Sequence, residues 1–153
     1  MKYERYAAVY EADDLSVFEF ISEGRNGKIK KRIVFAKTEM RGVYNIAFGN
    51  ISANNTLDDE TINDNGDRNK VLATVAQAVD RYTRRYPRRW IYFSGSTYAR
   101  TRLYRMAISL NLDELTKIFE IYAEVNGQEE FVPFHKNMVI EGFLVRRRIW
   151  AIS

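Results

Sequence analysis

The chain has 153 residues and a net charge of +4, and 46% of its residues are hydrophobic and 14% aromatic. This length suits one domain with a full hydrophobic core, and the apolar content excludes an intrinsically disordered chain. The sequence has no cysteine and one histidine, which excludes disulfides, zinc–thiolate sites and a cysteine nucleophile. With no apolar run long enough to span a bilayer and no signal-peptide pattern, we expect a cytoplasmic protein.

The first third of the chain has the pattern of an antiparallel meander. Apolar residues over 17–21 predict a strand, residues 24–27 a hairpin turn, and residues 29–35 the returning strand. Alternating side chains predict a third strand over residues 43–48. The polar stretch 50–67 then predicts a long loop that is either mobile or functional.

Two helices with a strand between them are predicted in the middle of the chain. Apolar residues recur at helical spacing over 71–86, after Asp67 as a helix cap and before Pro87. Residues 90–93 are apolar in succession, which predicts a central strand covered on both faces. A turn of small residues over 94–97 leads into the second helix.

The last third completes the predicted fold with two strands. They cover residues 119–125 and 142–150, and Asn126 and Gly127 mark a hairpin after the first of them. The resulting order is β-β-β-α-β-α-β-β. It predicts a single α/β domain of the α+β kind over residues 1–153, in which two main helices pack on a mixed, mostly antiparallel sheet.

The positive charge is concentrated in the middle of the chain. Residues 68–105 contain nine arginines, one lysine and a single acidic residue, Asp80, so this segment has a net charge of +9. Because a guanidinium group makes bidentate contacts with phosphate, we expect the segment to bind a phosphate-bearing ligand. Nucleic acid, either RNA or DNA, is the partner that this pattern favours.

The turn at the start of the second predicted helix is the predicted site. A helix N-terminus presents unpaired N–H groups that favour an anion, and the turn adds hydroxyl donors. The predicted ligand-binding residues are Ser96, Thr97, Arg100, Arg102, Tyr104 and Arg105, together with Arg68 at the start of the first helix. The alternative is that Ser96 or Thr97 only caps the helix and the arginines face solvent.

A second basic group surrounds the end of the first predicted helix. It consists of Arg81, Arg84, Arg85, Arg88 and Arg89. Together with Lys70, such a group can follow a nucleic-acid backbone, with Tyr98 or Tyr104 as stacking residues. Cations also stabilise helix C-termini, and both explanations stay open at this point.

The sequence predicts no catalytic residue, metal site or cofactor. His135 lies in a polar segment and is expected at the surface, and no serine–acid arrangement supports a catalytic triad. The sequence therefore leaves open whether the protein is an enzyme.

Three segments carry a family resemblance: FEFISEG at 18–24, NGDRNKVLATV at 65–75 and GSTYARTRLYRM at 95–106. They resemble the signature segments of a family of uncharacterised bacterial proteins of about this length, a domain of unknown function. The resemblance runs over most of the chain, to about Arg148, and implies no reaction.

The order of elements is also similar to the central part of GNAT-type acetyltransferases. In that family a glycine-rich turn before the first of these helices holds the pyrophosphate of coenzyme A, and a tyrosine of the next helix often serves as the acid. Gly66 matches one glycine of the turn and Tyr104 follows Leu103 as in the family's Leu-Tyr pair, whereas Arg68 replaces a small residue. The similarity implies an acetyltransferase-like enzyme using coenzyme A as an alternative function.

A third alternative is a protein-interaction component of a bacterial toxin–antitoxin or defence pair. In that role the arginines of the central segment would contact an acidic protein partner. No membrane partner is expected.

Overall fold

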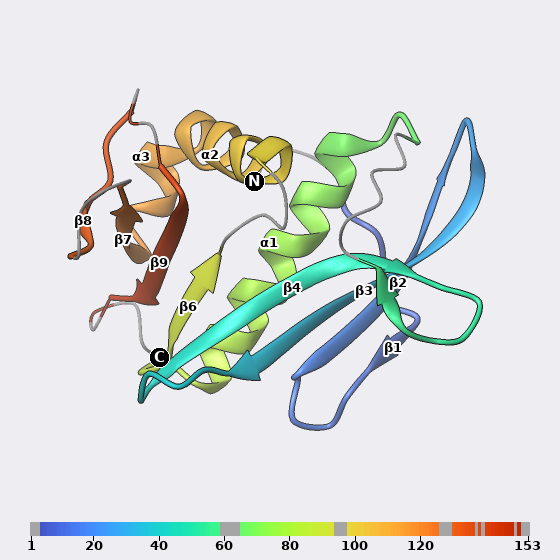
Figure 1. Cartoon of the computed structure of the whole chain (residues 1–153), viewed down its shortest axis with the longest axis horizontal. Helices are drawn as coiled ribbons and strands as arrows, with labels where there is room; N and C mark the ends of the chain where they lie inside the picture. The colour runs from blue at the N-terminus through green and yellow to red at the C-terminus, as the bar shows by residue number, and fades with distance from the viewer. Residues whose placement is uncertain are drawn as a thin grey trace. The chain divides into compact units, whose positions relative to one another are not determined.

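The computed structural model describes residues 4–58, 65–93, 98–125, 130–136, 138, 140–148 and 150, without the side chains of 98–100, 103 and 110. These residues form nine strands and three helices (Figure 1). In chain order they are β1 (Tyr10–Glu11), β2 (Val17–Gly24), β3 (Gly27–Lys37), β4 (Val43–Ile51), β5 (Leu57–Asp58), α1 (Arg68–Arg85), β6 (Trp90–Phe93), α2 (Tyr98–Leu110), α3 (Leu112–Leu115), β7 (Phe119–Glu124), β8 (Val132–Pro133) and β9 (Gly142–Arg147).

The described strands belong to one mixed sheet. Its strand order is β1-β2-β3-β4-β6-β9-β7-β8, and β5 pairs with β4 beside this path. β4 and β6, which α1 connects, run parallel, whereas β6 and β7 each pair with β9 in the antiparallel sense. The predicted α+β fold, with a mostly antiparallel sheet and two main helices, is confirmed.

Four short elements lie outside the predicted order, namely β1, β5, β8 and α3. Elements of two to four residues are too short to leave a periodic pattern in a sequence. The loop predicted over 50–67 is partly wrong, because Asn50 and Ile51 belong to β4 and pair with β5. Residues 59–64 and the hairpin predicted at Asn126 and Gly127 lie outside the described residues.

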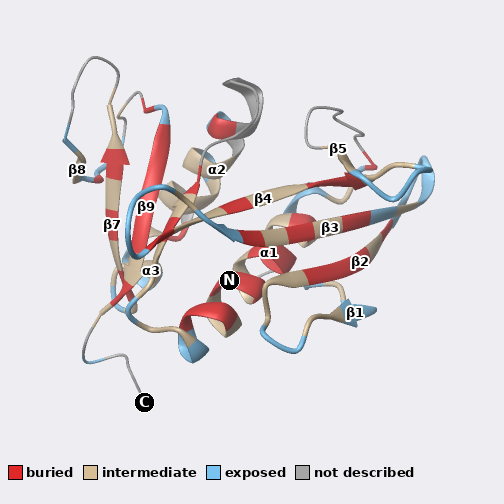
Figure 2. Ribbon diagram, turned by 60° about the horizontal axis from the view of Figure 1, so that its bottom comes forward, coloured by how far each residue is buried: buried red, intermediate tan, exposed pale blue. Residues whose placement is uncertain are grey.

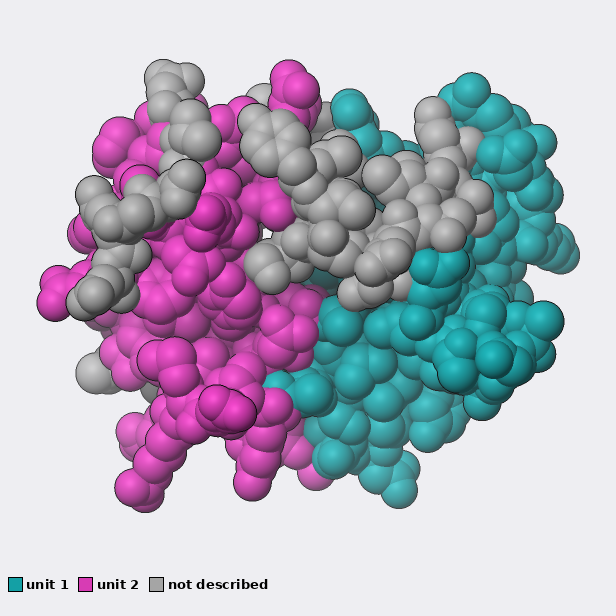
Figure 3. Space-filling model, in the orientation of Figure 1, with its two compact units in different colours: residues 1–36, 47–82 teal, residues 37–46, 83–153 magenta. Residues whose placement is uncertain are grey.

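Contacts within the chain divide it into two compact units (Figure 3). Unit 1 comprises residues 1–36 and 47–82, and unit 2 comprises residues 37–46 and 83–153. β3, β4 and α1 contribute residues to both units, so the division falls within these elements. Each unit has its own buried residues (Figure 2).

In unit 1, the hairpin of β2 and β3 packs one face against α1. Phe18, Phe20, Ile33 and Phe35 line this face and are each at most 4% exposed. The ring of Phe35 stacks on Tyr82 of α1, with 4.0 Å between the ring centroids. This packing explains the apolar stripe of the helix, because its period of three and four residues places such side chains on one face.

In unit 2, β6, β9 and β7 have one buried face, on which α2 packs. Ile91 and Phe143 are fully buried on this face. The ring of Phe93 lies edge-on to Tyr104 of α2, with 6.0 Å between the ring centroids. These contacts place α2 on the same side of the strands as the core of unit 2.

The other face of β6 differs from the prediction that helices cover both sides. Trp90 and Tyr92 alternate with the buried residues of this strand and are partly exposed. Their rings contact Tyr122 and Phe131, respectively, from neighbouring segments of unit 2. β6 is therefore apolar along its whole length because its partly exposed face carries aromatic side chains, and not because both of its faces are buried.

Candidate nucleic-acid interface

Part of the predicted site lies outside the described residues. This applies to Ser96 and Thr97 of the turn and to the side chain of Arg100, whose backbone belongs to the first turn of α2. Arg68 is described, and it is exposed as the first residue of α1 in unit 1. The role of the turn in binding an anion stays a prediction.

The other predicted residues lie on α2 in unit 2. Arg102 is exposed, whereas Arg105 donates a hydrogen bond of 3.0 Å to the carbonyl oxygen of Met138. Tyr104 is half-buried because its ring packs edge-on against Phe93. The structure thus places Arg102 at the surface and gives Arg105 and Tyr104 contacts within the unit.

Several exposed arginines lie where α1 ends. The four that come from the helix end and from the turn between β3 and β4 form what we call the basic surface: Arg41, Arg84, Arg85 and Arg88. The backbone N–H of Trp90 donates a hydrogen bond of 2.9 Å to the carbonyl oxygen of Gly42. This hydrogen bond holds the turn that carries Arg41 beside the chain that leaves α1.

Arg89 is held between two tyrosine rings beside the basic surface. Its guanidinium carbon lies 3.8 Å from the centroid of the Tyr86 ring and 4.2 Å from that of the Tyr44 ring. Each cation–π contact is worth about 0.5–1 kcal/mol at an exposed site. Because Tyr86 follows α1 and Tyr44 belongs to β4, Arg89 ties the end of the helix to the sheet.

Stabilisation of the helix end explains only part of this charge. A cation in the last turn of a helix contributes about 0.3–1 kcal/mol, and two of the four arginines lie there. Arg88 and Arg41 lie outside the helix, so the helix dipole does not account for them. Residues 81–89 contain five arginines and no acidic residue, while the neighbouring turn adds one acid, Glu39. The excess of positive charge at this end of α1 calls for a different explanation.

Arg81, the remaining arginine of that segment, forms an ion pair within unit 1. Its guanidinium donates two hydrogen bonds to the carboxylate of Glu11, one of them 2.9 Å long. These hydrogen bonds lower the pKa of the Glu11 carboxyl and raise the pKa of Arg81. Both changes in pKa favour the charged form of the group, and the hydrogen bonds hold the Arg81 guanidinium within unit 1.

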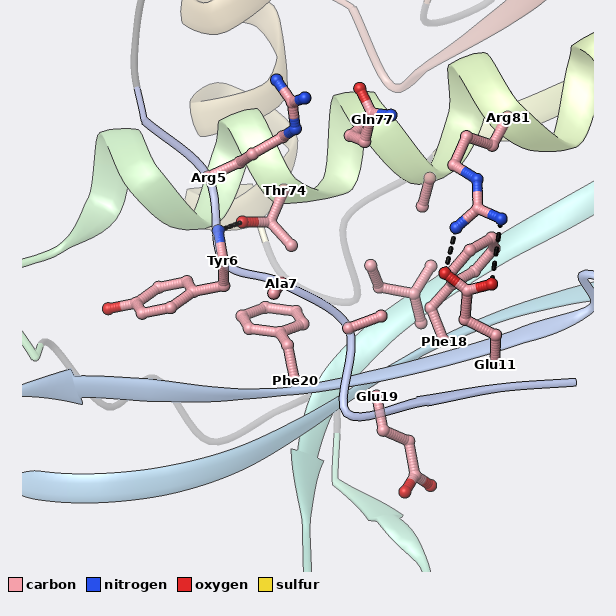
Figure 4. A pocket seen from close by; sticks show the side chains of 13 residues that line it. Arg5, Tyr6, Ala7, Glu11, Phe18, Glu19, Phe20, Thr74, Gln77 and Arg81 are labelled. Carbon is pink, nitrogen blue, oxygen red and sulfur yellow. Dashed lines mark hydrogen bonds and ion pairs between the residues drawn. The ribbon is translucent and has the colours of Figure 1, made fainter.

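The same ion pair borders a hollow in unit 1 (Figure 4). The hollow has a volume of about 180 Å³ and lies between the N-terminal segment, β2 and α1, with Phe18 and Phe20 at its base. At its other end, the backbone N–H of Tyr6 donates a hydrogen bond of 2.9 Å to the hydroxyl of Thr74. Small-molecule sites usually have volumes of about 300–1,000 Å³, so this hollow is small for a ligand site.

Two of the segments that carry the family resemblance meet at the start of α1. The carboxylate of Asp67, directly before the helix, accepts hydrogen bonds of 2.5 Å from the hydroxyls of Tyr6 and Ser22. The side-chain amide of Asn65 donates to the Ser22 hydroxyl at 3.0 Å. Burial, and then the hydrogen bond to Asp67, raise the pKa of Tyr6. These contacts hold the helix on the hairpin, and the carboxylate makes this helix end unfavourable for a second anion.

The sequence-based site omitted Arg41, Tyr44 and Tyr86. The two tyrosines fit the apolar patterns of a strand and a helix, so nothing in their spacing marks them as ligand residues. Only the parallel pairing of Val43 with Trp90 brings this turn to the end of α1. Only a method that predicts the pairing of β4 with β6 could have identified these three residues from the sequence.

The described residues contain no group of three or more histidine, aspartate or glutamate side chains suited to a metal ion. In the same part of the chain, no helix combines the length and the apolar character needed to cross a membrane. One protein-family model matches residues 2–148 and describes a family of unknown function, DUF6934. Comparison with curated proteins and with solved structures finds no match.

Proposed function

Since the chain belongs to the family of unknown function DUF6934, its membership assigns no activity, and we propose from the geometry of unit 2 that the protein binds nucleic acid. The basic surface contacts the phosphates. The observation that carries the proposal is the set of four exposed arginines beside Arg89, which two tyrosines hold in place. Guanidinium groups suit phosphate because they donate paired hydrogen bonds along with their charge.

The preference for arginine supports binding over mere solubility. Nine of the ten basic residues in 68–105 are arginines, although lysine serves solubility equally well. Each phosphate that an arginine neutralises releases counterions from the nucleic acid, which favours association and makes it salt-dependent. Arg102, exposed on α2, belongs to the same proposal, and its replacement in Arg102→Ala should weaken binding further.

The experiment compares two variants that remove equal charge from different places. Binding of labelled RNA and DNA strands of about 16 nucleotides is followed by fluorescence anisotropy at low salt. The combined variant Arg84→Gln, Arg85→Gln and Arg88→Gln should bind about tenfold more weakly, or worse. The matched control replaces three exposed lysines elsewhere by glutamine: Lys28, Lys117 and Lys136. An equal loss in both variants, or no binding by the unchanged protein, contradicts the proposal.

A second candidate is an acetyltransferase-like enzyme using coenzyme A. The order β4, α1, β6, α2 and β7 favours it, because the similarity to GNAT-type acetyltransferases rests on that order. Two contacts count against it: the Asp67 carboxylate directly precedes α1, at the helix start that the similarity would assign to the pyrophosphate, and the ring of Tyr104 packs against Phe93. A thermal shift with acetyl-coenzyme A decides between the candidates, because a ligand at a hundred times its Kd stabilises a protein by about 2.7 kcal/mol. No shift in the melting temperature counts against the enzyme.

The role in a toxin–antitoxin or defence pair stays a prediction from the charge alone. Co-purification with the product of a neighbouring gene is the observation that supports it, and a protein that purifies alone and is harmless when expressed weakens it.

A further inference from the structure

One face of the strands in unit 2 carries aromatic side chains that are partly exposed. Tyr92 of β6 and Tyr122 of β7 each pair with Leu144 of β9, so these side chains form one row across the strands. Next to this row, the guanidinium carbon of Arg146 lies 4.2 Å from the centroid of the Trp90 ring. We call this face, defined by Trp90, Tyr92, Tyr122, Leu144 and Arg146, the aromatic sheet face.

The opposite face of the same strands is the core of unit 2. Successive residues of a strand point to opposite faces, and Ile91 and Val145 on the core side are 0% and 6% exposed. The helix contacts lie on that side too, because Phe93 meets α2 and the Nε of Arg147 lies 3.3 Å from the hydroxyl of Thr83 in α1. The aromatic sheet face is the side away from these contacts, and Trp90 and Tyr122 are partly exposed on it, whereas Leu144 between the tyrosines is buried and 9% exposed.

Charged groups on the aromatic sheet face are paired with one another or with hydroxyls. Arg146 forms an ion pair with Glu120 at 3.1 Å, and these side chains are 36% and 28% exposed. The hydroxyl of Tyr92 donates a hydrogen bond to the Glu124 carboxylate. Such a face has little positive charge to attract phosphate, whereas its rings offer a surface on which planar groups stack. The chemistry of this face therefore suits bases rather than phosphates.

We propose that the aromatic sheet face stacks the bases of a single-stranded nucleic acid while the basic surface holds its backbone. This inference rests on the proposed function. Trp90 and Tyr122 are the stacking residues, with 5.7 Å between their ring centroids and 65° between their planes. The chain connects the two surfaces over a short distance, because Arg88 and Trp90 are only two positions apart. We expect a single-stranded ligand because the bases of a duplex are already stacked and paired. Unpaired bases are free to stack on aromatic rings.

The fluorescence of Trp90 can be used to detect a base that stacks on its ring. The chain has two tryptophans, so Trp150→Phe leaves Trp90 as the only source of tryptophan fluorescence. This variant is titrated with three probes: oligothymidine of about 16 nucleotides, a base-free deoxyribose-phosphate strand of the same length, and the oligothymidine paired with oligodeoxyadenosine. Oligothymidine should quench the Trp90 fluorescence and bind about tenfold more tightly than the other two probes.

A pair of substitutions at Tyr122 separates stacking from phosphate contact. Tyr122→Leu should lower the affinity for oligothymidine about tenfold and leave the affinity for the base-free strand unchanged, whereas Tyr122→Phe keeps the ring and the affinity. The control Tyr10→Leu replaces an exposed tyrosine of unit 1 and should change neither affinity. Binding of the base-free strand also shows that each variant is folded.

The outcomes distinguish this inference from the proposed function. Equal affinities for oligothymidine and the base-free strand, or unchanged Trp90 fluorescence on binding, overturn base stacking and leave phosphate binding in place. Tighter binding of the duplex than of the single strand also overturns base stacking. If neither strand binds, the proposed function fails and this inference fails with it.

Discussion

The guanidinium carbon of Arg89 lies 3.8 Å from the centroid of the Tyr86 ring, directly beyond the last turn of α1. Tyr44 contacts the same guanidinium at 4.2 Å. Arg89 is therefore packed between two rings, whereas Arg84, Arg85 and Arg88 are exposed, and the guanidinium carbon of Arg85 lies 5.7 Å from the Tyr86 ring centroid. Structure and binding can be tested separately on these residues.

The first prediction concerns the stability that Arg89 provides. Arg89→Lys keeps the charge but removes the planar group that packs on both rings. We expect it to lower the free energy of unfolding by about 1 kcal/mol, measured by urea denaturation. Arg88→Lys, at an exposed position, is the control and should change the free energy by less than about 0.5 kcal/mol. Equal effects of the two substitutions argue against a structural role for the contacts of Arg89.

A second prediction tests the junction between the hairpin of unit 1 and the start of α1. A Cβ atom at Gly24 would overlap the backbone carbonyl oxygen of Asn65, which a side chain cannot tolerate without movement of the backbone. Gly24→Ala should therefore destabilise the protein by about 3 kcal/mol or more.

Gly27→Ala is the matched control in the same hairpin. A Cβ atom at Gly27 meets nothing within 4 Å, and its φ of 84° makes alanine cost only about 1–2 kcal/mol. Thermal or urea unfolding of both variants gives the comparison. A Gly24→Ala variant that is as stable as Gly27→Ala shows that the hairpin and the helix start are not in close contact.

The third prediction concerns pH. The folded pKa of Glu11 lies below the ordinary value of about 4.3, because Arg81 donates hydrogen bonds to its carboxylate. The pair therefore adds stability that is fully present above that ordinary value and is lost as the pH falls through the folded pKa. We expect the difference in unfolding free energy between the unchanged protein and Glu11→Gln to be constant near neutral pH. It should shrink below about pH 4.

The control for this pH dependence is Glu4→Gln, at an exposed position in the same N-terminal segment. Its difference from the unchanged protein should stay small throughout, as for most exposed substitutions. A Glu11→Gln difference that persists undiminished in acid would mean that packing of the side chain, rather than its charge, is what matters.

Local periodicity was enough to predict the long elements but not the contacts between them. The spacing of Val71, Val75 and Tyr82 predicts α1 almost to its observed ends, because an amphipathic helix repeats its apolar residues. β1 and β5 have two residues each, too few for any pattern. The basic group after α1 was visible in the sequence, whereas its neighbour Arg41 depends on a parallel strand pair that no local signal marks.

The salt dependence of binding tests the central claim, phosphate contact by the basic surface, most directly. The logarithm of the association constant for single-stranded nucleic acid should fall linearly with the logarithm of the salt concentration, with a slope of about −3 for four phosphate contacts. In the combined variant Arg84→Gln, Arg85→Gln and Arg88→Gln, the slope should be about −1, because three contacts are lost. A slope near zero for the unchanged protein, or the same slope for both proteins, contradicts the claim.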